Sequence, residues 1–308
     1  MLIIGGIKMI KILGVDLGNY GAKTSEGVLI PSRVALGHKD LNKDAIKVIY
    51  NNKKYTVGTG NLKLGTSRIH STLYDLCLLT SISKSYPNEK NISVNIVMGL
   101  PPLQYESVLK KELEKKLSEF KTKKIIIDGD EITITINKSA VFSESAIVFG
   151  NPSKYRDKKT LVLDFGGGST DISQFKGLEL VKNTTTKLGM LTLCENMKQA
   201  LDAKETVTST IDDMEELINA DNAVIHGDNK DITYLKDVVT DHMVSIFNVV
   251  NQSFDTESTD IIAIGGGANK LESNIKGEYK NAVIAKDSQF VNANVYGMVG
   301  EMLWSGKN

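Results

Sequence analysis

The sequence is poor in cysteine: its 308 residues include two, Cys77 and Cys194. Neither belongs to a CxxC pair, and no histidines stand beside them at the spacing of metal ligands. These absences exclude a zinc motif and a disulfide framework. We interpret both cysteines as reduced, buried thiols, which predicts a cytoplasmic location.

The chain also lacks net charge, because 37 Lys and Arg residues balance 37 Asp and Glu residues. No global field therefore attracts nucleic acid or an anionic membrane, and direct nucleic-acid binding is not expected. No apolar run approaches the roughly 18 residues of a membrane span, and the N-terminus lacks the cleavage site of a signal peptide. We expect no membrane association.

Two common nucleotide-binding motifs are absent as well. No GxxxxGK[ST] occurs, which excludes a P-loop, and no GxGxxG separates a strand from a helix, which disfavours a Rossmann site. Instead, three apolar segments end in glycine-rich turns, at residues 12–18, 161–168 and 261–267. Successive glycines cost backbone entropy, so they mark either a tight hairpin or a place where a ligand approaches the main chain.

Two of these turns share one pattern. DLG (residues 16–18) and DFG (residues 164–166) each place an aspartate, an apolar residue and a glycine at the end of a probable strand. The two patterns lie about half the chain apart, and a chain of 308 residues exceeds the usual size of one compact core. The repeat therefore predicts two duplicated lobes that face one another.

Hydrophobic periodicity places the other elements coarsely. Alternating residues predict a hairpin that turns on Asp128-Gly129. Apolar residues at helical spacing predict helices over 102–120 and 233–253 and in the C-terminal segment. Central strands are expected at 10–17, 92–98, 160–165 and 261–264.

The paired turns have the chemistry of a triphosphate site. Consecutive backbone N–H groups in a tight glycine turn form a concave anion site. Asp16 and Asp164, one from each lobe, would hold Mg²⁺ through its waters, because this ion dehydrates reluctantly. Lys23 would add a point charge to the phosphate tail. The residues therefore predict a nucleoside triphosphate between the lobes.

Five segments carry a resemblance to a known superfamily. They are GVDLGNYGAK, VFSESAIVFG, LVLDFGGGSTDIS, IIAIGGGANKL and VNANVYGMVG, in this order. The set resembles the signature of the actin, sugar-kinase and seventy-kilodalton heat-shock ATPases. It is most similar to the ParM group of bacterial actin-like proteins that segregate plasmids. The resemblance runs from about residue 10 to residue 303 and is weak in 34–91 and 196–257.

The resemblance implies the fold class: α/β, an actin-like (ribonuclease H-like) two-lobed fold with duplicated mixed β-sheet cores and two small inserted subdomains. Lobe I is expected at 1–150 with an insertion at about 34–91. Lobe II is expected at 151–292 with an insertion at about 196–257. The C-terminal helix, 293–308, is expected to return to lobe I.

The resemblance also assigns the site. Glu144 is expected to polarise the attacking water, with Asp164 as the second catalytic residue; the alternative for Glu144 is a surface acid. Asp171 either supports the outer shell of the metal or caps the turn. Asn19 and Tyr20 are expected to bind the nucleotide as part of the first phosphate loop. Many relatives have a serine or threonine there, so the donor to the β-phosphate would be the Asn19 amide in place of a hydroxyl. The remaining nucleotide contacts are expected from Asp16, Gly18, Gly21 and Lys23 in the first loop, Gly166, Gly167, Gly168, Ser169 and Thr170 in the second, Gly265, Gly266, Gly267 and Asn269 beside the adenosine, and Gly189 near the ribose.

The implied activity is that of an ATPase that polymerises into a helical filament and segregates plasmid DNA through a DNA-bound adaptor protein. Its cofactors would be ATP and Mg²⁺, with GTP left open. A small-molecule kinase and a non-polymerising regulatory ATPase share this site and stay alternatives. The filament is favoured because the cysteine cluster and ExGH signature of compact kinases are absent, and no substrate-binding segment follows the last nucleotide motif.

Overall fold

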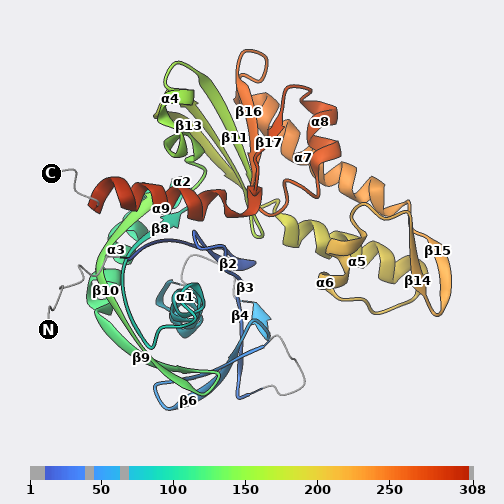
Figure 1. Cartoon of the computed structure of the whole chain (residues 1–308). Helices are drawn as coiled ribbons and strands as arrows, with labels where there is room; N and C mark the ends of the chain where they lie inside the picture. Colours follow the sequence, from blue (N-terminus) through green and yellow to red (C-terminus); the bar gives the residue numbers. More distant parts are fainter. Residues whose placement is uncertain (1–10, 39–44, 63–68, 305–308) are drawn as a thin grey trace, which may run out of the picture.

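The computed structural model describes residues 11–38, 45–62 and 69–304. Two β-sheets lie side by side with helices packed on them, and the C-terminal helix α9 (Val291–Trp304) runs between the sheets (Figure 1). We call the body built on the first sheet lobe I and the body built on the second sheet lobe II. Among the described residues, no helix has the length and apolar character needed to cross a membrane.

The sheet of lobe I curls around one helix, α1 (Thr72–Ser85), as Figure 1 shows. Nearly every α1 residue from Leu73 to Ser83 is buried, because the sheet surrounds the helix. The described strand order is β3-β2-β1-β8-β10-β9-β5-β6-β4-β7. The strands are β1 (Lys11–Leu17), β2 (Gly21–Thr24), β3 (Leu29–Pro31), β4 (Arg33–Leu36), β5 (Ile46–Tyr50), β6 (Lys53–Val57), β7 (Asn61–Leu62), β8 (Asn91–Leu100), β9 (Thr122–Ile127) and β10 (Asp130–Ser143).

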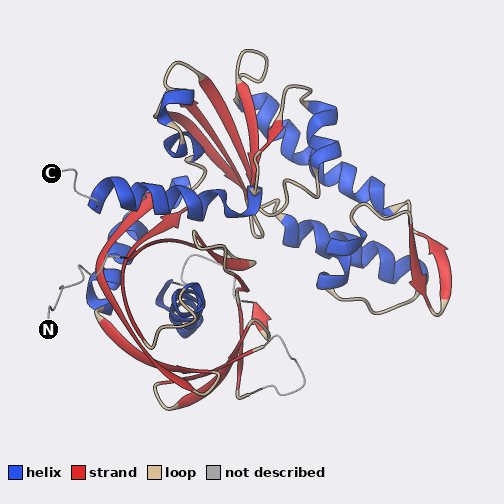
Figure 2. Cartoon of the chain, viewed as in Figure 1, coloured by secondary structure: helices blue, strands red, loops and turns tan. Residues whose placement is uncertain are grey.

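The sheet of lobe II has helices on both faces (Figure 2). The middle of its central strand is apolar because both faces are covered: Leu161 and Leu163 join the core under α5 and α7, while Val162 joins the core under α9. The described order is β13-β12-β11-β16-β17. The strands are β11 (Lys159–Phe165), β12 (Thr170–Lys176), β13 (Glu179–Thr186), β16 (Asp260–Ile264) and β17 (Val283–Ile284), and β14 (Asn222–Ile225) pairs with β15 (Asp228–Asp231) in a separate hairpin.

The helix expected over 102–120 is broken in two. α2 (Pro102–Tyr105) ends early, and the Ser107 hydroxyl accepts a hydrogen bond from the N–H of Leu109 to begin α3 (Val108–Phe120). The N-cap serine starts a new helix, although apolar residues keep their helical spacing through the break. The other helices are η2 (Ile147–Gly150), α4 (Pro152–Tyr155), α5 (Met190–Glu205), α6 (Ile211–Leu217), α7 (Leu235–Ser253), α8 (Glu272–Glu278) and η3 (Ser288–Phe290).

The repeat seen in the sequence corresponds to a repeat of strand pairing. β1 pairs antiparallel with β2 and parallel with β8, and β11 pairs antiparallel with β12 and parallel with β16. In each lobe the aspartate stands one residue before the end of the central strand. The domain boundaries stay a prediction; the described residues of 34–91 share one sheet and one core with β1.

Helix α9 packs directly on β1. A Cβ atom on Gly14 would lie 2.0 Å from the carbonyl oxygen of Ala293 and 2.4 Å from the backbone nitrogen of Gly297. Gly14 is therefore needed because two backbones approach each other closely at this point. The contact sets the depth at which α9 lies on lobe I.

Replacing Gly14 with alanine should destabilise the protein, because the added methyl group has no space beside α9. We expect the free energy of unfolding to fall by about 1–3 kcal/mol, the usual effect of overpacking. Chemical denaturation measures the change. Gly277, in α8, is the control: its Cβ would have no neighbour within 4 Å, so Gly277→Ala should raise stability by up to about 1 kcal/mol. Equal stability of Gly14→Ala and the parent would contradict this packing.

Candidate functional site

A cavity of about 660 Å³ lies where the parallel strands of both sheets end. Its wall includes residues at or just after the carboxyl ends of β1, β8, β10, β11 and β16. In open α/β sheets, ligands bind at the carboxyl ends of strands. The fold therefore brings strand ends from both lobes to one site.

Asp16 and Lys23 face each other across the first hairpin. They are register partners in the β1–β2 pair, and the Lys23 Nζ lies 3.2 Å from Asp16 Oδ2. Asp16 is only 5% exposed, so its charge needs a nearby cation. Lys23 supplies that cation from inside the same lobe, and both residues line the cavity.

Asp164 is equally buried, but its register partner on β12 is Asp171 and not a lysine. Asn292 Nδ2 donates a 2.8 Å hydrogen bond to Asp164 Oδ2, and the Ser145 hydroxyl lies 3.4 Å from the same oxygen. The pKa of Asp164 is raised to about 7, mainly by burial and next by the nearby carboxylate of Asp171, while the bond from Asn292 opposes the shift. Neutral hydrogen-bond donors stabilise the ionised form of this carboxyl group less than a neighbouring cation would.

Asp171 sits opposite Asp164 on the neighbouring strand β12. Its carboxylate accepts hydrogen bonds from the hydroxyls of Thr185 (2.5 Å) and Ser169 (3.2 Å). Burial raises the pKa of Asp171, and these two hydroxyl bonds act against the shift. Asp171 thus ties the second glycine turn to β13 and also lines the cavity.

The third glycine turn needs glycine at its first position. Gly265 has φ +89°, and a Cβ there would lie 2.5 Å from Asp164 Oδ1 and 2.6 Å from the carbonyl oxygen of Phe165. Both the left-handed backbone and the close approach exclude a side chain. The turn after β16 can therefore lie directly against the carboxylate that ends β11.

Glu144 follows the last residue of β10 and lines the cavity from lobe I. Its backbone N–H donates a 2.8 Å hydrogen bond to the carbonyl oxygen of Leu100. This bond continues the β8–β10 ladder by one residue and holds Glu144 at the cavity edge.

The structure brings most of the predicted site residues to the cavity wall; their roles stay a prediction. On the wall are Asp16, Gly18, Asn19, Tyr20, Lys23, Glu144, Asp164, Gly166, Gly167, Gly168, Ser169, Gly265, Gly266 and Gly267.

Four of the predicted residues lie off the wall. Gly21 packs in β2 against Leu29, and Asn269 is exposed on the surface. Gly189 lies behind the second turn, where a Cβ would be 2.6 Å from the carbonyl oxygen of Gly167, and the Thr170 hydroxyl donates to the carbonyl oxygen of Leu188. Gly189 and Thr170 therefore support the second turn from behind.

Five other wall residues have no predicted role, although one of them, Asn292, lies in the segment VNANVYGMVG. Pro101 and Gln104 follow β8, Lys187 follows β13, and Asn292 comes from α9. Glu215, on α6, comes from a segment whose sequence matches no motif. Only the folded chain places these five beside the glycine turns.

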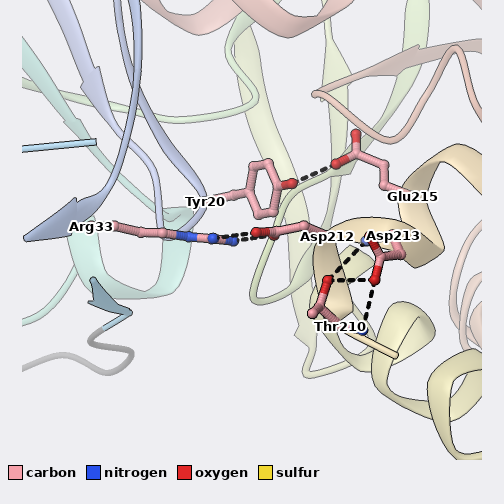
Figure 3. Close-up of polar contacts among 6 residues, drawn as sticks. All are labelled: Tyr20, Arg33, Thr210, Asp212, Asp213 and Glu215. Carbon is pink, nitrogen blue, oxygen red and sulfur yellow. Dashed lines mark hydrogen bonds and ion pairs between the residues drawn. The ribbon is translucent and has the colours of Figure 1, made fainter. Parts of the chain in front are cut away.

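Two polar contacts join the lobes at the cavity (Figure 3). The Tyr20 hydroxyl donates a 2.5 Å hydrogen bond to Glu215 Oε2, and Arg33 makes a bidentate ion pair with Asp212. We call these four residues the interlobe clasp.

The start of α6 orients the lobe II half of the clasp. Thr210 and Asp213 form a capping box at the start of α6, which orients Asp212 toward lobe I. The bond from Arg33 lowers the pKa of Asp212, and burial followed by the bond to Glu215 raises the pKa of Tyr20. At neutral pH Asp212 is therefore ionised and Tyr20 protonated, the states that these two contacts require.

Comparison with known proteins identifies the fold. Residues 14–146 match the family described as "Actin like proteins N terminal domain". A search of curated protein sequences finds no match. Among solved structures, the chain is similar to Ta0583, an archaeal actin homologue in complex with ADP, with a TM-score of 0.80 and 16% identity over 95% of this chain and 100% of that one.

Two bacterial structures are also similar. A 15-stranded ParM filament from Clostridium botulinum has a TM-score of 0.77 and 20% identity over 96% of this chain and 100% of that one. The apo pSK41 ParM protein has a TM-score of 0.68 and 21% identity over 96% and 98% of the two chains. The chain thus has the actin-like fold, which confirms the fold class and the resemblance seen in the sequence.

Asp164→Asn should stabilise the nucleotide-free protein at high pH. A carboxyl with a pKa raised from 3.8 to about 7 holds its proton more tightly in the folded than in the unfolded state. Its contribution to stability is present at low pH and is lost as the pH rises from about 4 to about 7. The advantage of the variant should grow by about 2–3 kcal/mol between pH 5 and pH 8. Denaturant titrations at both pH values check this, and an equal advantage at both would contradict it.

Reversing one charge of the clasp should open the cavity. Arg33→Asp or Asp212→Arg alone places like charges together, so small-angle scattering should show a larger radius of gyration. The double variant should restore the compact form, with a coupling free energy of about 1 kcal/mol because the pair is partly exposed. Lys90→Asp, which breaks the exposed Lys90–Asp130 pair within lobe I, is the control. A radius unchanged by both single reversals would exclude the clasp as an interlobe restraint.

Proposed function

We propose that this protein is a nucleotide-dependent, filament-forming actin-like ATPase of the cytoplasm that binds ATP with Mg²⁺ between its lobes. The observation that carries the proposal is the convergence of Asp16 and Asp164, one from each half of a strand repeat, on a single cavity lined by glycine turns. The actin-like fold supports it, because the similar Ta0583 structure is a complex with ADP.

The cavity fits a magnesium nucleotide. Its volume lies within the range of roughly 300–1,000 Å³ typical of small-ligand sites. Among the described residues, no hydrogen bond uses the N–H of Gly167 or Gly168 as donor, which leaves both available to phosphate oxygens. Asp16 and Asp164 would hold the cation through its waters. When bound, Mg²⁺ would neutralise charge that develops on the phosphate oxygens.

Glu144 is the residue that we assign to the hydrolysis step. Its carboxylate would accept a proton from a water molecule as the water oxygen bonds to the γ-phosphorus and the bond to the β–γ bridging oxygen breaks. The products are ADP and inorganic phosphate, and the proton passes from Glu144 to solvent. Lys23 would leave Asp16 for the phosphate tail, which releases Asp16 toward the cation.

The clasp would couple the state of the nucleotide to the angle between the two lobes. Tyr20 belongs to the first glycine turn and also bonds to Glu215 on α6. A change in that turn on loss of the γ-phosphate would therefore act directly on the contact between the lobes. The interlobe angle would then decide whether subunits fit head to tail in an open helix.

Two of the similar solved structures support the proposal that this protein assembles into filaments. One is a 15-stranded ParM filament and another is an Alp12 filament. The near-zero net charge of this chain is compatible with self-association. We further propose that a DNA-bound adaptor protein links the filament to plasmid DNA, because this chain has no basic excess of its own.

Glu144→Ala should slow ATP turnover by at least about 100-fold, the usual contribution of a general base, and leave filaments that persist. Phosphate release measures turnover, and pelleting or light scattering after addition of Mg·ATP measures assembly. Glu131→Ala changes an exposed acid of β10 and should match the parent in both assays.

A parent protein that hydrolyses ATP without any rise in pelleted protein would exclude the filament. A rate that increases only with an added sugar or acid would identify a kinase instead. Normal turnover by Glu144→Ala would remove Glu144 from the mechanism.

A further inference from the structure

One buried amide connects the two catalytic candidates. Asn292, in the first turn of α9, donates from Nδ2 to Asp164 Oδ2 at 2.8 Å and accepts at Oδ1 from the Ser145 N–H at 3.0 Å. Asp164 ends a strand of lobe II, and Ser145 follows Glu144 at the end of a strand of lobe I. The side chain of Asn292 thus spans the junction between the two sheets.

Ser145 has an unfavourable backbone conformation that contacts with its neighbours must stabilise. Its φ is +60° although it is not glycine, and it is fully buried. A left-handed conformation costs a residue with a Cβ roughly 1–2 kcal/mol. The bond from its N–H to Asn292 and the contact of its hydroxyl with Asp164 oppose that cost.

Glu144 is consequently fixed from both sides. Its own N–H bonds to the carbonyl oxygen of Leu100, and the next N–H along the chain bonds to Asn292. The first bond belongs to the β8–β10 ladder, whereas the second depends on a side chain from the far end of the sequence. Removing the second would leave the Ser145 hydroxyl, 3.4 Å from Asp164 Oδ2, as the remaining contact of Ser145 with lobe II that is described above.

We propose that Asn292 is a positioning residue, which sets the Glu144 turn at a fixed place relative to Asp164. The inference rests on the proposed function for its consequence, since positioning matters only if Glu144 activates a water. The geometry itself does not depend on that function. In this role Asn292 acts on the reaction through Asp164 and Ser145.

An amide is the group that this place requires. Asp164 needs a donor, and the Ser145 N–H needs an acceptor, and one short side chain must provide both. An aspartate at 292 could accept but not donate, and would add a second buried carboxylate. Alanine could do neither.

The position of Asn292 is in turn set by the packing of α9. Gly14 lets the helix backbone approach β1 at Ala293 and Gly297, directly beside Asn292. The buried ring of Tyr296, one turn further along, lies over Gly99, where a Cβ would be 1.9 Å from the Tyr296 hydroxyl. The packing of the helix on lobe I thereby fixes the amide that reaches Asp164 in lobe II.

The first test needs no nucleotide. In Asn292→Ala, the amide hydrogen of Ser145 should exchange about 5- to 30-fold faster than in the parent, the change expected for loss of one buried hydrogen bond. Mass spectrometry of a peptide that includes residues 143–147, or NMR, measures it. Asn294→Ala is the control, because Asn294 lies on the same helix but lines a different cavity. Unchanged exchange at Ser145 would overturn the proposal.

The second test separates positioning from binding. Asn292→Ala should lower kcat for ATP hydrolysis by at least 10-fold, with a change in KM of less than about 3-fold, while Asn294→Ala keeps both values. Filaments of Asn292→Ala should form with Mg·ATP and persist. If Asn292→Ala does not fold, Asn292→Ser, whose shorter side chain has one polar atom in place of the two amide atoms, should show a smaller loss in the same direction.

The two proposals fail in different ways. A parent protein without ATPase activity would remove the proposed function and, with it, the consequence for catalysis, whatever the exchange result. A parent that hydrolyses ATP, with faster exchange at Ser145 but unchanged kcat in Asn292→Ala, would overturn the positioning role alone.

Discussion

The burial of one carboxylate at the end of each central strand is the constraint on which the structure depends. A buried carboxylate costs several kcal/mol unless a cation or hydrogen-bond donors compensate it. Asp16 meets a cation, Lys23, on its own hairpin. Asp164 is compensated by Asn292 and Ser145, which come from α9 and from the end of β10. Satisfying Asp164 therefore also determines how the two sheets meet.

The glycine turns follow from the same constraint. A Cβ on Gly167 would lie 2.6 Å from Cβ of Tyr20, and one on Gly168 would lie 2.4 Å from the side-chain nitrogen Nδ2 of Asn19. The first and second turns thus pack on each other across the lobe boundary. Glycine there serves the approach of two backbones as well as the approach of a ligand, and the two uses require the same small residues.

Features formed by residues close together in the sequence could be predicted, and contacts between distant residues could not. The strand, aspartate and glycine of each half lie within a few residues, so the repeat predicted the paired turns, which form part of the cavity wall. Asp212 and Glu215 could not be predicted, because they pair with Arg33 and Tyr20 across 179 and 195 positions. Asn292 stands in an apolar helix and resembles a core residue. The break before α3 depends on one capping serine, which apolar spacing cannot show.

The two carboxylates also differ in what a bound nucleotide changes. Asp16 already has a cation, so a phosphate that attracts Lys23 exchanges one ion pair for another within lobe I. Under the proposed function, Asp164, whose hydrogen-bond partners are neutral, would gain a nearby cation, which would favour its ionised form. Under the proposed function, the larger change in free energy on binding therefore falls on lobe II, at the residue whose neutral partners come from α9 and from the Glu144 turn. The nucleotide can then shift the junction between the sheets while each sheet keeps its own pairing.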